Sequence, residues 1–263
     1  MDAAAVVAAY EAGDEDLRLG LERNRVEWDR TRELLARWLP PTPARILDVG
    51  GASGRYAAWL QDAGYQVQLI DPVPKHVEQA TARGLPAQVG DARRLPFDDG
   101  TWDAVLLLGP LYHLPAAADR TRALAEAVRA CAPGGIVIVA AMSRWAKPAE
   151  RAALHQLTDP DIHRHLVTVL RHGHDADGSA FDRVAYNHDP AELRHELTAA
   201  GLDAVEVLGV EGPLGSFARQ NAELNDVALV TARLAEQDAP HLSLHLLARG
   251  HVPAARVTES DRT

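Results

Sequence analysis

The sequence has one cysteine and few aromatic residues, and these shortages exclude several kinds of protein. Cys131 stands alone among 263 residues, so the chain cannot form an intrachain disulfide or a metal site built from cysteines. Phe, Trp and Tyr together make up 5% of the chain. No apolar run approaches the length of a membrane span. Residues Met1–Val7 lack a basic leader, and we therefore expect a cytoplasmic protein.

Basic residues are also scarce relative to acidic ones. The chain has 27 Lys and Arg against 37 Asp and Glu, a formal net charge of −10. A protein that holds phosphate backbones needs a basic face, so this balance disfavours nucleic acid as the substrate. The remaining composition, 47% hydrophobic and 24% charged, is ordinary for a globular protein. The length suits one α/β domain with an insertion.

One stretch, residues 45–56, has the pattern of a strand, a glycine turn and a helix. Residues 45–49 are mainly apolar and follow a group of prolines. The chain then turns through Gly50, Gly51 and Gly54, and helical spacing follows. Such a unit opens a doubly wound α/β sheet, in which the glycines let a ligand approach the backbone. The amides at the start of the following helix would point at that ligand.

Acidic residues follow the next two expected strands. Asp71 and Pro72 come directly after an apolar segment, about 20 residues beyond the turn, where a carboxylate accepts hydrogen bonds from both hydroxyls of a ribose. Gly90, Asp91 and Ala92 follow the third expected strand. The sequence predicts strands over residues 46–49, 65–70, 86–89, 102–108, 136–141, 202–210 and 241–248, and a continuous helix over 217–236.

The glycine turn resembles the Asp/Glu-x-Gly-x-Gly-x-Gly motif of class I S-adenosylmethionine (SAM)-dependent methyltransferases. Asp48, Gly50 and Gly54 match this motif, and Ala52 occupies the position of the middle glycine. Residues 95–108 are similar to the segment that leads into the fourth strand of that family, and Pro-Gly-Gly at 133–135 is similar to its turn before the fifth. The Gly-x-Gly-x-x-Gly spacing of nicotinamide enzymes is absent.

The resemblance implies a doubly wound, mostly parallel sheet of seven strands whose last strand is antiparallel. It also implies N-terminal helices and a helical insertion after strand 5. We expect a helical flap over residues 1–40, a SAM-binding methyltransferase domain over 41–250 and a polar tail over 251–263. Residues 142–188 of the domain would be a lid over the acceptor.

The resemblance also implies SAM as the cofactor and a set of residues that contact it. Asp71 would bind the ribose, and Asp91 with Ala92 the adenine. The residues expected to contact the cofactor are Asp48, Gly50, Gly51, Gly54, Asp71, Pro72, Asp91, Ala92, Leu108 and Gly109.

Residues after the fourth strand are the candidates for the chemistry. The ligand of an open α/β sheet lies beyond the carboxyl ends of its strands, so Tyr112 and His113 should face the methyl group and its acceptor. Histidine titrates near neutral pH, so His113 is a candidate general base, and a purely pocket-shaping role is the alternative. Tyr10, Arg18 and Trp145 are further candidates to contact the acceptor, together with Tyr112 and His113.

Five histidines gather in the expected insertion, at positions 155, 163, 165, 172 and 174. Imidazoles can bind metal ions, but the pairs 163/165 and 172/174 are two residues apart and do not share one face of a helix. We therefore expect a solvated helix and loop there, and no metal site.

The sequence favours SAM-dependent methyl transfer to oxygen or nitrogen of a small molecule, such as a secondary metabolite. A small-molecule carbon methyltransferase, a non-catalytic SAM-binding protein and a nicotinamide dehydrogenase are the alternatives. We expect no nucleic-acid or membrane partner. The oligomeric state stays open, with a homodimer among the alternatives.

Overall fold

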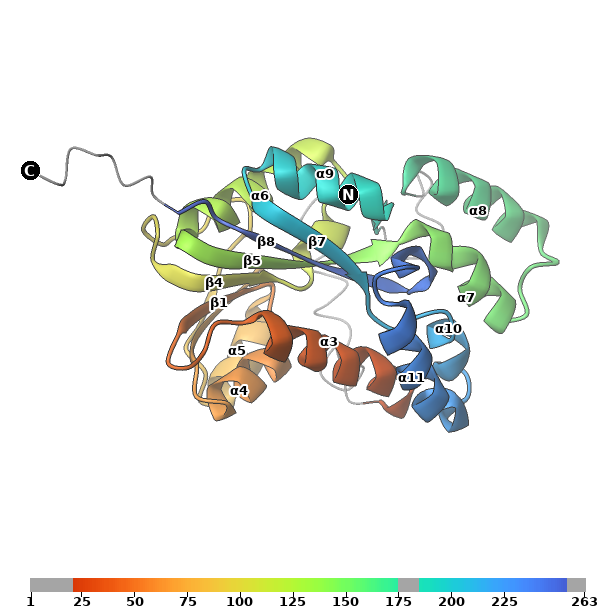
Figure 1. Cartoon of the computed structure of the whole chain (residues 1–263), viewed down its shortest axis with the longest axis horizontal. Coiled ribbons are helices and arrows are strands. Elements are labelled where there is room, and N and C mark those ends of the chain that lie inside the picture. Colours follow the sequence, from red (N-terminus) through yellow and green to blue (C-terminus); the bar gives the residue numbers. More distant parts are fainter. Residues whose placement is uncertain (1–20, 175–184, 255–263) are drawn as a thin grey trace, which may run out of the picture.

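The structure is a computed structural model that describes residues 21–174 and 185–254. Its centre is one twisted sheet with helices on both faces (Figure 1). Tyr10 and Arg18 of the expected flap, most of the loop after residue 172 and most of the polar tail lie outside the described residues. In the described residues, no helix is long and apolar enough to cross a membrane.

The strands have the order β3-β2-β1-β4-β5-β8-β7, with β8 antiparallel to both of its neighbours and the other pairs parallel. This confirms the doubly wound sheet of seven strands that the resemblance implied. A short additional strand, β6, pairs with the end of β5. The strands are β1 (Arg45–Val49), β2 (Gln66–Asp71), β3 (Ala87–Val89), β4 (Trp102–Leu107), β5 (Cys131–Ser143), β6 (Asn187–His188), β7 (Asp203–Gly209) and β8 (His245–His251).

Two layers of helices cover the sheet. Helices α3, α4 and α5 lie against one face and α6 and α9 against the other (Figure 1). The helical elements are η1 (Glu22–Asn24), α3 (Arg25–Trp38), α4 (Arg55–Asp62), α5 (Pro74–Ala82), η2 (Pro110–His113), α6 (Ala117–Ala130), η3 (Arg144–Ala146), α7 (Lys147–Ala153), α8 (Pro160–His172), α9 (Pro190–Ala199), α10 (Gly215–Ala218), η4 (Ala222–Leu224), α11 (Asn225–Ala235) and η5 (Pro240–Leu242).

The two faces of the sheet have separate cores, because alternate residues of a strand point to opposite sides. On β4, Val105 and Leu107 pack toward α6 and α9, whereas Ala104 and Leu106 pack toward α3 and α4. These residues are all buried. The continuous apolar run of this strand therefore has the composition of a central strand covered on both sides.

The sequence prediction was wrong about where the fifth strand begins. We expected a strand from Ile136, but β5 begins at Cys131 and contains a bulge. The register with β4 shifts between Cys131 and Ile136, and Gly134 inside the bulge has φ +80°. A left-handed residue there lets the strand absorb the extra residues without ending.

Two further element predictions were wrong in the last third of the chain. The helix expected over 217–236 is broken into α10, η4 and α11, because the side chain of Asn221 accepts a hydrogen bond from the Glu223 amide and starts a new turn. The last strand runs over His245–His251, since residues 240–242 form η5, so His251 belongs to the sheet rather than to the tail.

The expected insertion is not wholly outside the sheet. Strand β5 extends to Ser143, and β6 returns the chain to pair with it. Helices α7 and α8 lie between them in the sequence, and Asp189 caps the start of α9 in a capping box with Glu192. The role of this segment as a lid stays a prediction.

Candidate active site

The glycine turn after β1 has the tight geometry that its sequence predicted. Gly50 and Gly54 have φ of +72° and +84°, and Gly54 begins α4 in the left-handed conformation. A Cβ on Gly50 would lie 2.8 Å from the Pro110 side chain, so only glycine fits between the two loops. Ala52 has φ +49°, a strained value for a residue with a side chain.

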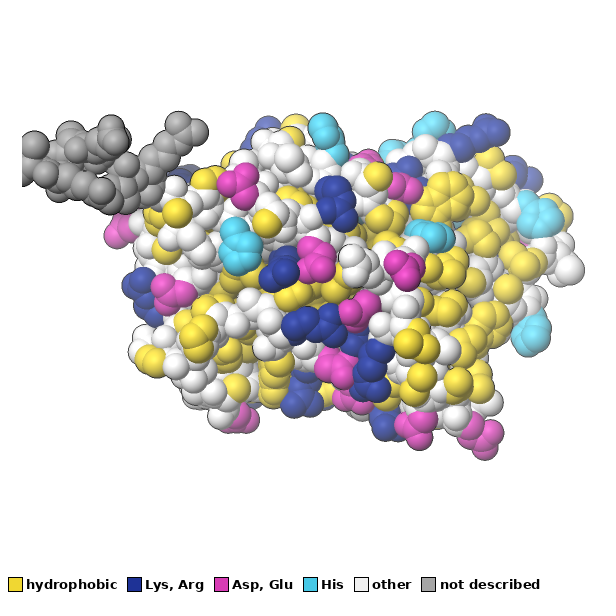
Figure 2. Space-filling view, viewed as in Figure 1, with side chains coloured by type: hydrophobic (Ala, Val, Ile, Leu, Met, Phe, Trp, Pro, Cys, Tyr) yellow, Lys and Arg dark blue, Asp and Glu magenta, His cyan; other side chains and the backbone are white. Residues whose placement is uncertain are grey.

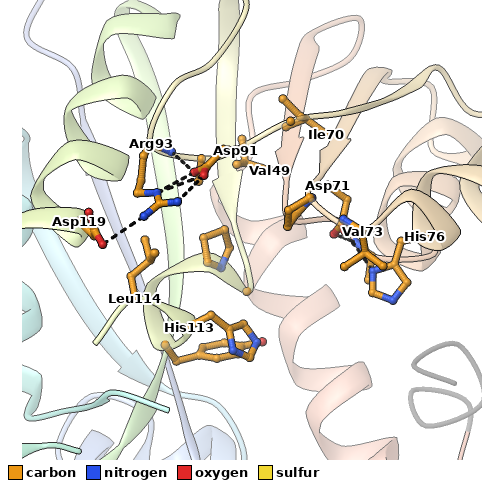
Figure 3. Close-up of a pocket in the computed structure, with 18 of the residues that line it drawn as sticks. Val49, Ile70, Asp71, Val73, His76, Asp91, Arg93, His113, Leu114 and Asp119 are labelled. Atoms are coloured by element: carbon orange, nitrogen blue, oxygen red, sulfur yellow. Dashed lines mark hydrogen bonds and ion pairs between the residues drawn. The ribbon is translucent and has the colours of Figure 1, made fainter. Parts of the chain in front are cut away.

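Two cavities lie at the carboxyl ends of the strands, on either side of this turn. The first, of about 210 Å³, extends past β2 and β3 (Figure 3). The second, of about 70 Å³, lies toward α3 and β8. Gly50, Ala52, Gly109 and Tyr112 line both cavities, so the two spaces meet at the loops that follow β1 and β4.

Asp71, at the end of β2, is buried beside the first cavity and already accepts several hydrogen bonds. Its carboxylate accepts bonds from the amides of Ala52 and Val73, both at 2.9 Å, and lies 3.0 Å from Nδ1 of His76. The bond to Ala52 ties the glycine turn to the second strand. Asp71 therefore fixes the shape of the turn as well as offering its remaining lone pairs to a ligand.

Asp91 faces the same cavity from the loop after β3 and is held by Arg93 (Figure 3). The guanidinium of Arg93 donates to both carboxylate oxygens of Asp91, one bond being 2.6 Å long, and also reaches Asp119 on α6 at 3.2 Å. Hydrogen bonds from Arg93 lower the pKa of Asp91. Arg93 therefore keeps Asp91 ionised and oriented at the rim of the cavity.

The second cavity contains a buried carboxylate with no hydrogen-bond partner among the described residues. Asp48 is only 1% exposed, and neither of its oxygens is paired. Burial, with a smaller contribution from the nearby Asp71 charge, raises the pKa of Asp48 to about 7. An unpaired buried acid is costly, so this position calls for a cationic or hydrogen-bond-donating group in the cavity.

His245 and Glu27 also line this cavity, and His245 is held by a buried carboxylate that the sequence did not predict, Glu211. The Glu211 carboxylate accepts a 2.9 Å bond from the His245 amide and a short bond from Nδ1 of the same residue. Glu27 on α3 lies near both and pairs with Arg219 at 2.6 Å. Glu211 follows β7 and His245 begins β8, 34 residues later, so no local spacing could have signalled the pair.

Among the described residues, only one group of three or more His, Cys, Asp or Glu side chains could hold a metal ion. It consists of Glu27, Glu211 and His245, whose possible ligand atoms lie within 4.8 Å of one another. Glu27 is already paired with Arg219, and Glu211 with His245, so a metal ion would have to compete with both pairings. The expectation that the protein has no metal site stays a prediction.

The structure places most predicted cofactor residues at the two cavities. Asp71, Pro72, Asp91 and Ala92 line the first, Asp48, Gly51 and Leu108 line the second, and Gly50 and Gly109 line both. Gly54 lines neither, and its part is to let α4 begin. In the first cavity, His76 and Arg93 are contributors that sequence reasoning missed.

The residues expected to contact the acceptor do not all lie at the two cavities. Tyr112 lines both cavities and its hydroxyl donates to the Leu108 carbonyl at 3.3 Å, whereas His113 lines only the first. Trp145 lines neither and is 47% exposed, because its indole N–H donates to Asp189 at 2.6 Å. Tyr10 and Arg18 lie outside the described residues.

Comparison with known proteins agrees with this geometry. Residues 47–139 match the family model of a methyltransferase domain. An uncharacterized methyltransferase of Mycobacterium tuberculosis is 35% identical over 37% of this chain and 40% of its own length. A demethylmenaquinone methyltransferase of Deinococcus radiodurans is 31% identical over 52% of this chain and 56% of its own length. A probable tRNA methyltransferase 9B of Homo sapiens is 32% identical over 43% of this chain and 24% of its own length. The chain thus covers less than two thirds of each relative.

Among solved structures, a possible histamine N-methyltransferase of Thermotoga maritima has the same fold, with a TM-score of 0.59. It is 19% identical, and the match covers 90% of this chain and 94% of that one. The sheet order, the glycine turn and the matched domain identify a class I SAM-dependent methyltransferase domain in this chain. The cofactor of this class is SAM.

The residues at the two cavities fit that cofactor. Gly50 lines both cavities and has no side chain, so a ligand lying along the turn can approach the main chain there. The unpaired Asp48 carboxylate suits an ammonium group, and Asp71 suits ribose hydroxyls. The two cavities share lining residues at the turn, so one extended ligand lying across it would contact residues of both.

Proposed function

We propose that this protein transfers the methyl group of SAM to an oxygen or nitrogen atom of a small molecule, with secondary metabolites as the substrate class. The observation that carries the proposal is the position of the two cavities on either side of Gly50 and Gly109, with Asp71 and Asp91 at the first and further ionisable groups at the second. Secondary metabolism and a cytoplasmic location stay predictions.

In this proposal, different residues of the chain bind different parts of the cofactor. Asp71 accepts from the ribose, Asp91 with the amide of Ala92 binds the adenine, and Asp48 binds the ammonium of the methionine part. When bound, the cofactor supplies a methyl group activated by a positive sulfur. The protein then contributes mainly alignment, which can supply on the order of 7–11 kcal/mol.

A small acceptor is favoured over RNA by the charge of the protein. The net charge is −10. Figure 2 shows Lys and Arg interspersed with Asp and Glu on the face in view, without a basic stripe. Ion pairs such as Arg37–Glu236 and Arg249–Glu206 further commit basic side chains to acidic neighbours. A phosphate backbone would meet little uncompensated positive charge there.

A carbon acceptor is the second candidate, supported by two observations. The Deinococcus relative is, by its name, a demethylmenaquinone methyltransferase, and Tyr56 and Tyr112 line the second cavity. Aromatic rings can stabilise positive charge that develops near the acceptor. With a ¹³C-methyl label in the cofactor, the carbon shift of the product distinguishes methyl groups on oxygen, nitrogen and carbon.

Calorimetry with SAM tests the cofactor assignment. Wild type should bind SAM and not NAD, and Asp71→Ala should weaken SAM binding by about 10- to 100-fold, because a charged hydrogen-bond partner is lost. Asp62→Ala, at an exposed position on α4, is the matched control and should bind like wild type. Equal affinity in the Asp71 and Asp62 variants would contradict the ribose assignment. Turnover with an acceptor panel separates an enzyme from a non-catalytic SAM-binding protein.

A further inference from the structure

We propose that Glu211 and His245 form the proton-accepting pair of the transfer reaction, and that the acceptor is therefore a hydroxyl or an amine that must lose a proton. This inference rests on the proposed function and deepens it. It also moves the general base from His113, which lines only the first cavity, to a residue of the second.

The fold brings the two residues to the edge of the sheet where the methyl group must lie. Glu211 comes two residues after the carboxyl end of β7, which runs parallel to β5. His245 begins the antiparallel β8 and is paired with Met142 near the carboxyl end of β5. His245 thus lines the second cavity together with Gly109 and Tyr112, which also line the first.

The hydrogen bonds orient the imidazole for accepting a proton. A carboxylate can only accept, so Nδ1 of His245 carries its hydrogen toward Glu211 and the lone pair remains on Nε2. Glu211 is only 1% exposed and also accepts the His245 amide, so ring and backbone are fixed by the same carboxylate. Glu211 is accordingly a positioning residue, and His245 is the group that meets the acceptor.

Charged groups from several parts of the chain surround His245, and the carboxylates among them make it a stronger base. Burial alone would lower the pKa of His245, but the carboxylates of Glu211 and of Glu27 on α3 raise it above its usual value. Arg219, after α10, has a smaller opposing effect. Asp48 of β1 lines the same cavity. A positive sulfur beside this cluster would favour the neutral imidazole, which is the form that can accept a proton.

The step balances without any further reactant. The acceptor's O–H or N–H gives its proton to Nε2 of His245, and the resulting lone pair forms the new bond to the methyl carbon. The electron pair of the carbon–sulfur bond stays on sulfur, which becomes neutral, and the imidazolium later returns its proton to water. This step requires that His245 lie close enough to that sulfur for the positive charge to change the pKa of the imidazole.

The titration of His245 in two complexes tests this requirement without any acceptor. SAM and S-adenosylhomocysteine differ only in the methyl group and its positive charge. With ¹³C-labelled histidine, the signal missing from His245→Gln identifies the residue among the 12 histidines, and His245→Asn serves if that variant does not fold. We expect the pKa of His245 to be lower by about one unit or more with SAM than with S-adenosylhomocysteine.

His251, at the other end of β8, is the matched control, assigned with His251→Gln. Its titration should be the same in both complexes. Glu211→Gln should lower the pKa of His245 in the unliganded protein, an effect that a purely structural role would not produce. If both ligands bind but His245 titrates identically with each, the inference is overturned and the proposed function stands. If neither ligand binds, the proposed function itself fails.

Discussion

Asp48 is a single residue whose burial has a cost in stability, and the cofactor binding that we propose would offset this cost. It is buried without a partner in the described residues, and burial raises its pKa to about 7. The folded protein therefore keeps a proton on Asp48 that the unfolded chain has already released above pH 4. The protein thus accepts an unfavourable residue at this position, which a cationic ligand group would offset.

This cost predicts a pH-dependent effect of Asp48→Asn on the unliganded protein. As pH rises from about 4 to 7, Asp48 removes on the order of 4 kcal/mol from the free energy of unfolding, because its pKa is about three units higher in the folded state. Asparagine does not titrate, so the variant should be more stable than wild type at pH 8 and close to it at pH 4. Urea unfolding at several pH values measures the difference.

The exposed Asp62→Asn variant is the control and should follow wild type at every pH. A difference between Asp48→Asn and wild type that does not change with pH would show that burial does not perturb this carboxyl. In the presence of SAM the order should reverse at pH 8, since only the aspartate can pair with the ammonium group.

At the scale of residues, sequence pattern predicted the part of the site that lies in local motifs. Asp48, Asp71 and Asp91 each stand at the end of an expected strand, and the structure places them at the two cavities. Glu211 and His245 are 34 residues apart and belong to no motif, so only the antiparallel pairing of β7 with β8 brings them together. Long-range pairing is the information that pattern reasoning lacks.

At the scale of elements, one buried ionic network joins α6, β6 and α9. Arg120 donates to Glu196 at 2.7 Å and to the carbonyls of Leu114 and Pro115, and Nε2 of His188 lies 3.2 Å from Glu196. Arg120 and His188 are buried. This network fixes the segment where the chain returns from α7 and α8 to the sheet.

We predict that Glu196→Gln destabilises the protein by about 3–5 kcal/mol, because it leaves the buried Arg120 without its counter-charge. Burial opposes ionisation of Glu196, but hydrogen bonds from His188 and Arg120 prevail and lower its pKa to about 2. The stability that it contributes is present above the usual pKa of a glutamate and is lost as pH falls toward 2. Thermal and urea unfolding at pH 7 and pH 3 measure both effects.

Glu223→Gln, on the exposed face of η4, is the control for the loss of one acidic residue. It should unfold like wild type at both pH values. Equal stability of Glu196→Gln and Glu223→Gln at pH 7 would mean that the network adds nothing to the attachment of β6.

The elements themselves were predictable wherever one local pattern dominated. The strand expected over 102–108, for example, is observed as β4. Around Gly134 the Pro-Gly-Gly sequence has the composition of a turn, but pairing with β4 and β8 continues β5 through it as a bulge. Near Asn221 helical periodicity continues in the sequence, and a single side-chain hydrogen bond ends the helix.

At the scale of the whole molecule, the distribution of charge bears on the choice between a small acceptor and RNA. The excess of acidic residues leaves the chain at −10, and two acidic residues, Glu27 and Asp48, line the second cavity. Because association with RNA depends on neutralising phosphates, a negative molecule must overcome repulsion before it makes any contact. One of the relatives is nevertheless named as a tRNA methyltransferase, so the point needs a direct measurement.

We predict that the protein binds mixed tRNA more weakly than about 100 μM at physiological salt, the weak end of non-specific nucleic-acid binding. Fluorescence anisotropy with labelled tRNA, with and without saturating S-adenosylhomocysteine, measures the affinity. Lowering the salt should produce little gain, because few counterions are released when few phosphates are neutralised. Micromolar binding that weakens steeply as salt is added would contradict the prediction and favour a nucleic-acid substrate.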